Sequence, residues 1–213
     1  MSNIDELIAQ HCPSGVEHLP FTAVGKFSRG GGPQKKDFQD SGVGCIHYGQ
    51  IYTYYGTAAN VANKFVSEGV ASKSRQAQPG DVIIAVTGEN DDDLARGVAW
   101  LGSQPVAVSN HTLIFSSDLD PQYVSYFLRS SAFDKEKRRH IMGTKVRSIS
   151  ASAFDKILIP IPPLEVQRAI VEVLDTFSKL EAELEAELEA RKQQYEHYQL
   201  AVFETLALEG AER

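Results

Sequence analysis

The C-terminal quarter of the chain contains one long stretch without a helix-breaking residue. Pro162 and Pro163 come directly before it, and neither proline nor glycine occurs again until Gly210. Proline suits the first position of a helix and glycine suits its C-terminal cap, so these residues mark the expected ends. The middle of the stretch, KLEAELEAELEARKQQ, consists almost entirely of strong helix formers. The sequence therefore predicts a single helix of about 44 residues, which would be about 66 Å long.

This helix carries a row of apolar side chains spaced mostly by three or four residues. The row begins at Val173 and ends at Leu206, with Arg191 filling one position. The spacing is typical of a coiled coil with a stutter between Leu184 and Leu188. We expect the row to pack on a partner helix, because a solvated single helix, the alternative, would leave aromatic side chains in water. The partner helix belongs either to another copy of the chain or to another protein. The residues expected to make this contact, and hence dimerisation if the partner is a second copy, are Phe177, Leu180, Leu184, Leu188, Tyr195 and Tyr198.

The preceding residues form short segments rich in β-branched and aromatic side chains, separated by turn signals. Pro79-Gly80 precedes the apolar segment DVIIAVT, and Asp120-Pro121 is typical of a helix start. Residues 43–48 and 51–55 lie on either side of Gly49-Gln50, which predicts a hairpin. We therefore expect an α+β domain with a mostly antiparallel or mixed sheet over residues 1–160, followed by the long coiled-coil helix over residues 161–210. Further strands are expected at 97–101, 106–108, 112–115 and 157–161, with helical segments at 3–10 and 150–154.

Composition excludes several classes of protein. With 42% hydrophobic and 23% charged residues, the chain is not a fully disordered one. The two cysteines, Cys12 and Cys45, are too few for a disulfide-stapled secreted module. No apolar run approaches the roughly 20 residues that a membrane-spanning helix needs, and the acidic start MSNIDELIAQ does not resemble a signal peptide. We therefore expect a cytoplasmic protein that does not bind a membrane.

The net charge of −7 is concentrated in the helix. Residues 161–213 contain 12 of the 28 acidic residues but 5 of the 21 basic ones, so residues 1–160 are balanced. Residues 129–147 hold seven basic residues against two acidic ones. Local patches of this kind matter more than net charge for binding a polyanion, although a soluble charged face is the alternative. The expected phosphate contacts are Lys35, Lys36, Arg138, Arg139, Lys145 and Arg147.

Polar and aromatic side chains interleave with these basic segments. Amide side chains read adenine edges in the major groove of DNA, and other polar side chains add hydrogen bonds there. The residues expected to contact bases are Tyr48, Gln50, Asn90 and His111.

No motif for catalysis or metal binding occurs. Gly30-Gly31-Gly32 lacks the Lys-Ser/Thr ending of a phosphate-binding loop, and there is no nucleophile elbow or HExxH sequence. Residues 91–93, three aspartates near Glu89, are interpreted as a solvated loop in preference to a metal site. Four candidate zinc ligands match no common spacing: Cys12, His18, Cys45 and His47. We expect no catalytic residue, metal or cofactor in this chain.

The junction between the sheet domain and the long helix has a distinctive pattern, LIPIPPLEVQRAIVEVLDTF, followed by the glutamate-rich helix and RKQQYEHYQ. It resembles the specificity subunit of Type I restriction–modification systems, in which a target-recognition domain ends in P-x-P-P-L-x-x-Q-x-x-I and leads into a long helix. The segments IHYGQIYT, PGDVIIAVTGEN, NHTLIF and IMGTKVRSISASAF also resemble the family. The residues that match the junction pattern are Pro160, Pro162, Pro163, Leu164, Gln167 and Ile170.

The resemblance implies a non-catalytic subunit that binds double-stranded DNA sequence-specifically. It implies a modification subunit as partner, which methylates adenine and carries S-adenosylmethionine, and a restriction subunit that can also join. Family members usually have two recognition domains and two antiparallel helices, whereas this chain has one of each. We therefore expect a homodimer through an antiparallel coiled coil that reads an interrupted palindrome; a heterodimer with another half-subunit is the alternative.

Two other function classes stay open at this point. One is a stand-alone DNA-binding regulator or scaffold without a methyltransferase partner. The other is a metal-dependent nuclease fragment that uses Asp81 and Glu89.

Overall fold

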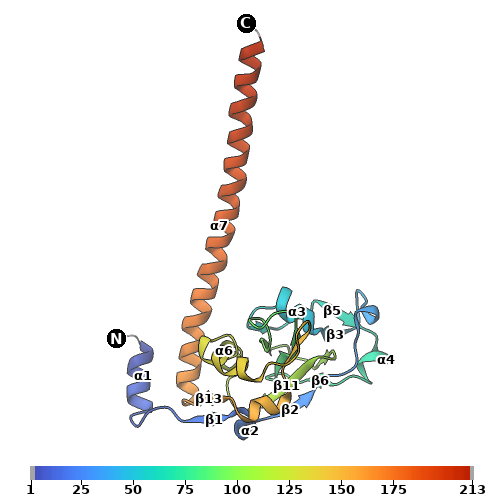
Figure 1. Cartoon of the computed structure of the whole chain (residues 1–213), viewed down its shortest axis with the longest axis vertical. Coiled ribbons are helices and arrows are strands. Elements are labelled where there is room, and N and C mark those ends of the chain that lie inside the picture. Colours follow the sequence, from blue (N-terminus) through green and yellow to red (C-terminus); the bar gives the residue numbers. More distant parts are fainter. Residues whose placement is uncertain (1–2, 212–213) are drawn as a thin grey trace. The chain divides into compact units, whose positions relative to one another are not determined.

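The structure is a computed structural model that describes residues 3–211, with side chains described over residues 4–203. The chain divides into two compact units, Met1–Val171 and Glu172–Arg213. Among the described residues, the first unit holds all the strands, and the second is the remainder of the long helix α7 (Figure 1). Within the described residues, no helix is long and apolar enough to cross a membrane.

The larger sheet of the first unit has five strands in the order β2-β11-β7-β9-β4. All neighbours pair antiparallel except β4 and β9, which pair in parallel, so the sheet is mixed and mostly antiparallel as predicted. The strands are β2 (Gly25–Arg29), β11 (Thr112–Ser117), β7 (Val82–Ala85), β9 (Gly97–Trp100) and β4 (Ala58–Ala59).

Strand β7 lies in the middle of the protein core, which explains why its sequence is apolar without interruption. Val82 and Ile84 belong to one buried cluster, whereas Ile83 and Ala85 belong to another. Successive side chains of a strand point to opposite faces of the sheet. Both faces of β7 are therefore covered, and no polar position is left in it.

A second sheet of four strands has the order β5-β3-β10-β6, and three further helices lie near it. Here β3 and β10 are parallel, and the other pairs are antiparallel. Its strands are β5 (Lys64–Val66), β3 (Val43–Ile46), β10 (Val106–Val108) and β6 (Gln76–Ala77). Three helices neighbour these strands along the chain: η1 (Lys35–Asp37) precedes β3, α3 (Tyr48–Thr53) follows it, and α4 (Glu68–Ala71) lies between β5 and β6.

Two short strand pairs and several helices complete the first unit. The strand pairs are β1 (His18–Pro20) with β13 (Leu158–Pro160), and β8 (Thr87–Gly88) with β12 (Arg147–Ser148). The remaining helices are α1 (Asn3–His11), α2 (Phe21–Val24), α5 (Pro121–Phe127), α6 (Ser131–Lys137), η2 (Arg138–His140) and η3 (Ala151–Asp155). Helix α5 begins as predicted, because the Asp120 carboxylate accepts hydrogen bonds from the N–H groups of Gln122 and Tyr123.

The predicted hairpin around Gly49-Gln50 is wrong: residues 48–53 form helix α3 instead of a turn and a second strand. His47 Nδ1 accepts a hydrogen bond from the Gly49 N–H at 3.2 Å, and Gln50 Oε1 accepts one from the His47 N–H at 2.9 Å. This reciprocal capping box satisfies the first turn locally. It also places Ile51 and Tyr55, four residues apart, together in the core, which outweighs their strand propensity.

The junction pattern holds the first turn of helix α7 (Leu164–Ala211) within the first unit. Gln167 Oε1 accepts a hydrogen bond from the Asp120 N–H at 2.9 Å, while its Nε2 donates to the Pro162 carbonyl at 2.8 Å. Val166 beside it is fully buried. The glutamine therefore joins the start of α7 to the start of α5.

Helix α7 has 48 residues and continues past Gly210, the predicted cap. One glycine costs a helix only about 1 kcal/mol relative to alanine, so it does not by itself end one. In the second unit the predicted apolar row is exposed along its length, with Phe177 at 64%, Leu184 at 65% and Tyr195 at 68%. The side chain of Leu206, predicted to extend the row, lies outside the described residues.

Candidate DNA interface

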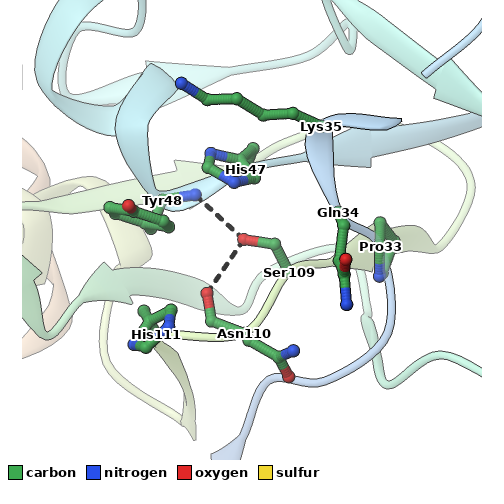
Figure 2. A pocket seen from close by; sticks show the side chains of 8 residues that line it. All are labelled: Pro33, Gln34, Lys35, His47, Tyr48, Ser109, Asn110 and His111. Carbon is green, nitrogen blue, oxygen red and sulfur yellow. Dashed lines mark hydrogen bonds between the residues drawn. The ribbon is translucent and has the colours of Figure 1, made fainter. Parts of the chain in front are cut away.

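A polar pocket of about 230 Å³ lies where three segments of the first unit meet (Figure 2). The segments are the loop before η1, the start of α3, and the turn between β10 and β11. The residues that line it are Pro33, Gln34, Lys35, His47, Tyr48, Ser109, Asn110 and His111. Three predicted DNA contacts, Lys35, Tyr48 and His111, are thereby brought together.

Hydrogen bonds and ring contacts hold the pocket in shape. The Tyr48 N–H donates to Ser109 Oγ at 3.0 Å, and that hydroxyl donates to the Asn110 carbonyl at 3.1 Å (Figure 2). The Tyr48 and His111 rings lie 5.3 Å apart, edge to face. His111 adopts a left-handed backbone with φ of 67°, which is uncommon outside glycine and is found preferentially at functional sites.

His47 is the pocket residue whose role the sequence did not reveal, since it was considered only as a zinc ligand. It is 8% exposed, and burial lowers the pKa of its imidazole, with nearby Lys35 and His111 adding to the shift. Because Nδ1 accepts the Gly49 N–H, the proton of the neutral ring lies on Nε2. His47 therefore offers a fixed hydrogen-bond donor. The signal available in the sequence was the His-x-x-Gln spacing of the capping box.

The other two predicted base contacts serve local structure. Gln50 uses Oε1 in the capping box, and its buried Nε2 has no hydrogen-bond partner among the described residues. Asn90 lies in a different loop, where Oδ1 accepts the Asp93 N–H at 2.8 Å and Nδ2 donates to Asp93 Oδ2 at 2.7 Å. Neither side chain lines the pocket, and their role in DNA contact stays a prediction.

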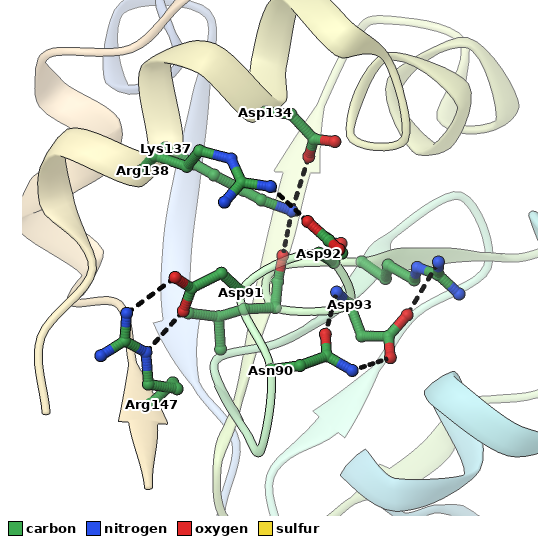
Figure 3. A network of polar contacts seen from close by, with 10 residues as sticks. Asn90, Asp91, Asp92, Asp93, Asp134, Lys137, Arg138 and Arg147 are labelled. Carbon is green, nitrogen blue, oxygen red and sulfur yellow. Dashed lines mark hydrogen bonds and ion pairs between the residues drawn. The ribbon is translucent and has the colours of Figure 1, made fainter. Parts of the chain in front are cut away.

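Three of the predicted phosphate contacts, Arg138, Arg139 and Arg147, are engaged in ion pairs, and Figure 3 shows those of Arg138 and Arg147. Arg147 forms a forked pair with Asp91, with nitrogen–oxygen distances of 2.5 and 2.7 Å. This hydrogen bond lowers the pKa of the Asp91 carboxyl and raises that of the Arg147 guanidinium. Arg138 pairs with Asp92, and Arg139 pairs with Glu136 at 2.8 Å.

The predicted solvated loop at residues 91–93 is therefore an ion-paired one. Asp93 also has a partner, Arg96, at 2.7 Å. Lys137 has a fully buried side chain whose Nζ lies 2.6 Å from Asp134 (Figure 3). The same group donates hydrogen bonds to the loop carbonyls of Asp92 at 2.9 Å and Leu94 at 2.8 Å. Pairing of β8 with β12 brings the loop at residues 91–93 close to Arg147. No local sequence pattern predicts this pairing.

The remaining predicted phosphate contacts, Lys35, Lys36 and Lys145, are exposed. Their amino groups make no ion pair with any side chain over residues 4–203. They are available to a polyanion without prior loss of a partner.

The described side chains contain no group of three or more His, Cys, Asp or Glu residues that could hold a metal ion. Asp81, one of the two acids considered for a nuclease, accepts a hydrogen bond from the Gln78 N–H at 2.7 Å in the turn before β7. Cys45 is fully buried as a free thiol, and burial raises its pKa to about 12.

Comparison with known proteins agrees with this architecture. The family described as Type I restriction modification DNA specificity domain matches residues 13–190. The specificity subunit of the Type I restriction enzyme EcoKI of Escherichia coli K12 is 27% identical over 119 residues, which is 53% of this chain and 25% of that protein. The MjaVIII specificity subunit of Methanocaldococcus jannaschii is 27% identical over 128 residues, 56% of this chain and 29% of that protein.

Solved structures show the same fold. The HsdS subunit of Thermoanaerobacter tengcongensis has a TM-score of 0.56 at 18% identity, covering 85% of this chain and 44% of that one. The S subunit of M. genitalium has a TM-score of 0.52 at 12% identity, covering 78% and 39%. The chain thus spans less than a third of the curated relatives in the aligned part and less than half of the solved ones. Since the family match extends over most of the sequence, the chain belongs to the Type I restriction–modification DNA specificity domain family.

Proposed function

We propose that the chain is a non-catalytic specificity subunit that reads one half-site of DNA and acts as a pair of copies. The observation that carries this proposal is the exposed apolar row on α7 in a member of a DNA specificity family. Two antiparallel copies of the helix would cover both rows and leave one recognition domain at each end. A 48-residue helix is about 72 Å long, against roughly 34 Å for one turn of DNA. The pair would read an interrupted palindrome.

The polar pocket supplies suitable chemistry for reading bases. Amide groups of Gln34 and Asn110 both donate and accept hydrogen bonds, and His47 offers a donor at Nε2. Such groups match the donor and acceptor pattern of base edges in the major groove. Lys35 and Lys36, beside the pocket, would neutralise phosphates.

The partner follows from the family. We infer that the chain carries a modification subunit that methylates adenine, and that S-adenosylmethionine is bound there and not by this chain. A restriction subunit would join the same complex. The acidic side chains of α7 outside the apolar row offer a docking face for the modification subunit.

The test is a methylation map. The chain is co-expressed with the modification subunit encoded beside it in a host without DNA methylation, and modified adenines are located by sequencing. An interrupted palindrome is expected. An asymmetric motif would contradict the homodimer and indicate a different second domain. No methylation with both proteins soluble would contradict the specificity function and favour a regulator.

A further inference from the structure

The glycine run at residues 30–32 is shaped by two close neighbours. A Cβ at Gly30 would lie 2.1 Å from Thr112 Oγ1, and one at Gly32, where φ is 131°, would lie 2.1 Å from Ser74 Oγ. Between them, the Gly31 carbonyl accepts a hydrogen bond from the Arg75 N–H at 2.7 Å. Only glycine allows so close an approach. The run is thereby threaded between the β10–β11 turn and the segment after α4.

This threading brings together three cations that the sequence keeps apart. Arg29, Lys73 and Arg75 are exposed and line a pocket of about 450 Å³. The rest of its lining is Gly30, Gly31 and Ser74, so it contains no carboxylate. None of the three cationic groups makes an ion pair or a hydrogen bond with the side chains described over residues 4–203.

The arginines of residues 138–147 differ from these three cations in the free energy that they would gain by binding a phosphate. Arg138, Arg139 and Arg147 each have a carboxylate partner, so a phosphate must replace that carboxylate before any attraction is gained. Unpaired cations have only mobile counterions to release, and this release drives the binding of proteins to DNA phosphates.

The location also suits a phosphate site. The segment that contributes Arg29 to this pocket continues at once into Pro33, Gln34 and Lys35 of the polar pocket. Contacts to the backbone of DNA fix the register in which neighbouring side chains meet the bases. A strand of DNA held at one pocket would therefore present base edges to the other.

We propose that Arg29, Lys73 and Arg75 form a phosphodiester-binding site that positions DNA against the polar pocket. The proposal rests on the DNA-binding function proposed above and names residues for it that neither the sequence pattern nor the family match assigns.

The experiment measures binding of the full chain to a fluorescein-labelled random-sequence duplex by fluorescence anisotropy, at several salt concentrations between about 50 and about 200 mM. The slope of log K, where K is the association constant, against log salt is negative. The variant Arg29→Ala/Arg75→Ala is expected to reduce the magnitude of this slope by about 2. Its loss of affinity between those two salt concentrations should accordingly be about tenfold smaller than that of the wild type. Arg29→Lys/Arg75→Lys, which keeps both charges, should retain the wild-type slope.

Arg138→Ala/Arg139→Ala is the comparison variant, because it removes the same charge from ion-paired positions. It should reduce the magnitude of the slope by less than Arg29→Ala/Arg75→Ala does. If the wild type binds and Arg29→Ala/Arg75→Ala leaves the slope unchanged, or both double variants reduce its magnitude equally, the proposed site is wrong. If the wild type binds no duplex even at low salt, the DNA-binding function itself fails. Circular dichroism of each variant checks that the fold is retained.

Discussion

Gln167 shows how one polar side chain fixes the start of the long helix. Its amide satisfies the Asp120 N–H and the Pro162 carbonyl at once, in a position only 3% exposed. Replacement by alanine removes both hydrogen bonds, one of which lies in a part-buried and the other in a buried position. We expect Gln167→Ala to lower the free energy of unfolding by about 1–3 kcal/mol, measured by urea denaturation. Arg168→Ala, at the exposed neighbouring position, should change it by less than about 0.5 kcal/mol; equal effects would contradict this role.

Asp91 gives the pair with Arg147 a defined dependence on pH. The forked hydrogen bond depresses the pKa of this carboxyl below its ordinary value of 3.8. Its stabilising contribution is therefore complete above that ordinary value and is lost as pH falls through the lower pKa of the folded protein. Asp91→Asn should shift the urea midpoint downward at pH 7 and have little effect once acid has protonated the wild-type carboxylate.

The exposed Asp40 provides the control for this comparison. No hydrogen bond or ion pair of its side chain occurs among the described residues. Asp40→Asn should leave the pH profile of stability unchanged. A constant difference between wild type and Asp91→Asn at every pH would show that the pair does not depend on the carboxylate charge.

At the scale of elements, the segment over residues 30–32 offers an internal comparison between adjacent glycines. A Cβ at Gly30 would lie 2.5 Å from the Ser109 carbonyl as well as 2.1 Å from Thr112, whereas one at Gly31 meets nothing nearer than Asn110 Oδ1 at 3.6 Å. Gly30→Ala should therefore destabilise the protein by about 1–3 kcal/mol through overpacking. Gly31→Ala should stay within about 0.5 kcal/mol. Thermal denaturation of both variants tests this, and the reverse order would place the close approach elsewhere.

Elements whose signals are local were predictable from the sequence. Strand β7 was marked by Pro79-Gly80 and an apolar run, helix α5 by Asp120-Pro121, and helix α7 by its unbroken helix formers. Helix α3 was missed because Ile51 and Tyr55 fit a strand equally well by composition. What decided between them was the capping box of His47 and Gln50 together with burial against β7, a tertiary contact.

The candidate site was predictable only in part, for a similar reason. Tyr48 and His111 converge because they follow the paired strands β3 and β10, and Lys35 reaches the same pocket from η1. The sequence predicted all three as DNA contacts but did not reveal that they share a pocket. The ion pair of Asp91 with Arg147 joins residues 56 positions apart, and Arg29 meets Arg75 through the threaded glycines. Charge runs along a sequence do not reveal which charges are neutralised in the fold.

At the scale of the whole molecule, charge and apolar surface are divided between the two units. The sheet unit holds the unpaired cations of the proposed phosphate site and the polar pocket, whereas α7 carries the excess acidic charge together with the exposed apolar row. An acidic helix repels the phosphates of DNA. It therefore suits the proposed role in assembly and spacing, in which DNA contact would be left to the sheet unit.

The association of two copies is tested on the apolar row itself. Leu184 and Leu188 are 65% and 56% exposed, and each adds apolar area to any contact made by the row. Leu184→Glu/Leu188→Glu would bring charges into the contact from both copies. We expect light scattering after size-exclusion chromatography to give the mass of a dimer for the wild type and of a monomer for this variant.

Ala182→Glu/Ala186→Glu is the matched control, since two residues along a helix correspond to a rotation of about 200°. It adds the same charge on the opposite face and should remain dimeric. A monomeric wild type would contradict the homodimer, and an unchanged mass for the leucine variant would place its contact outside this row.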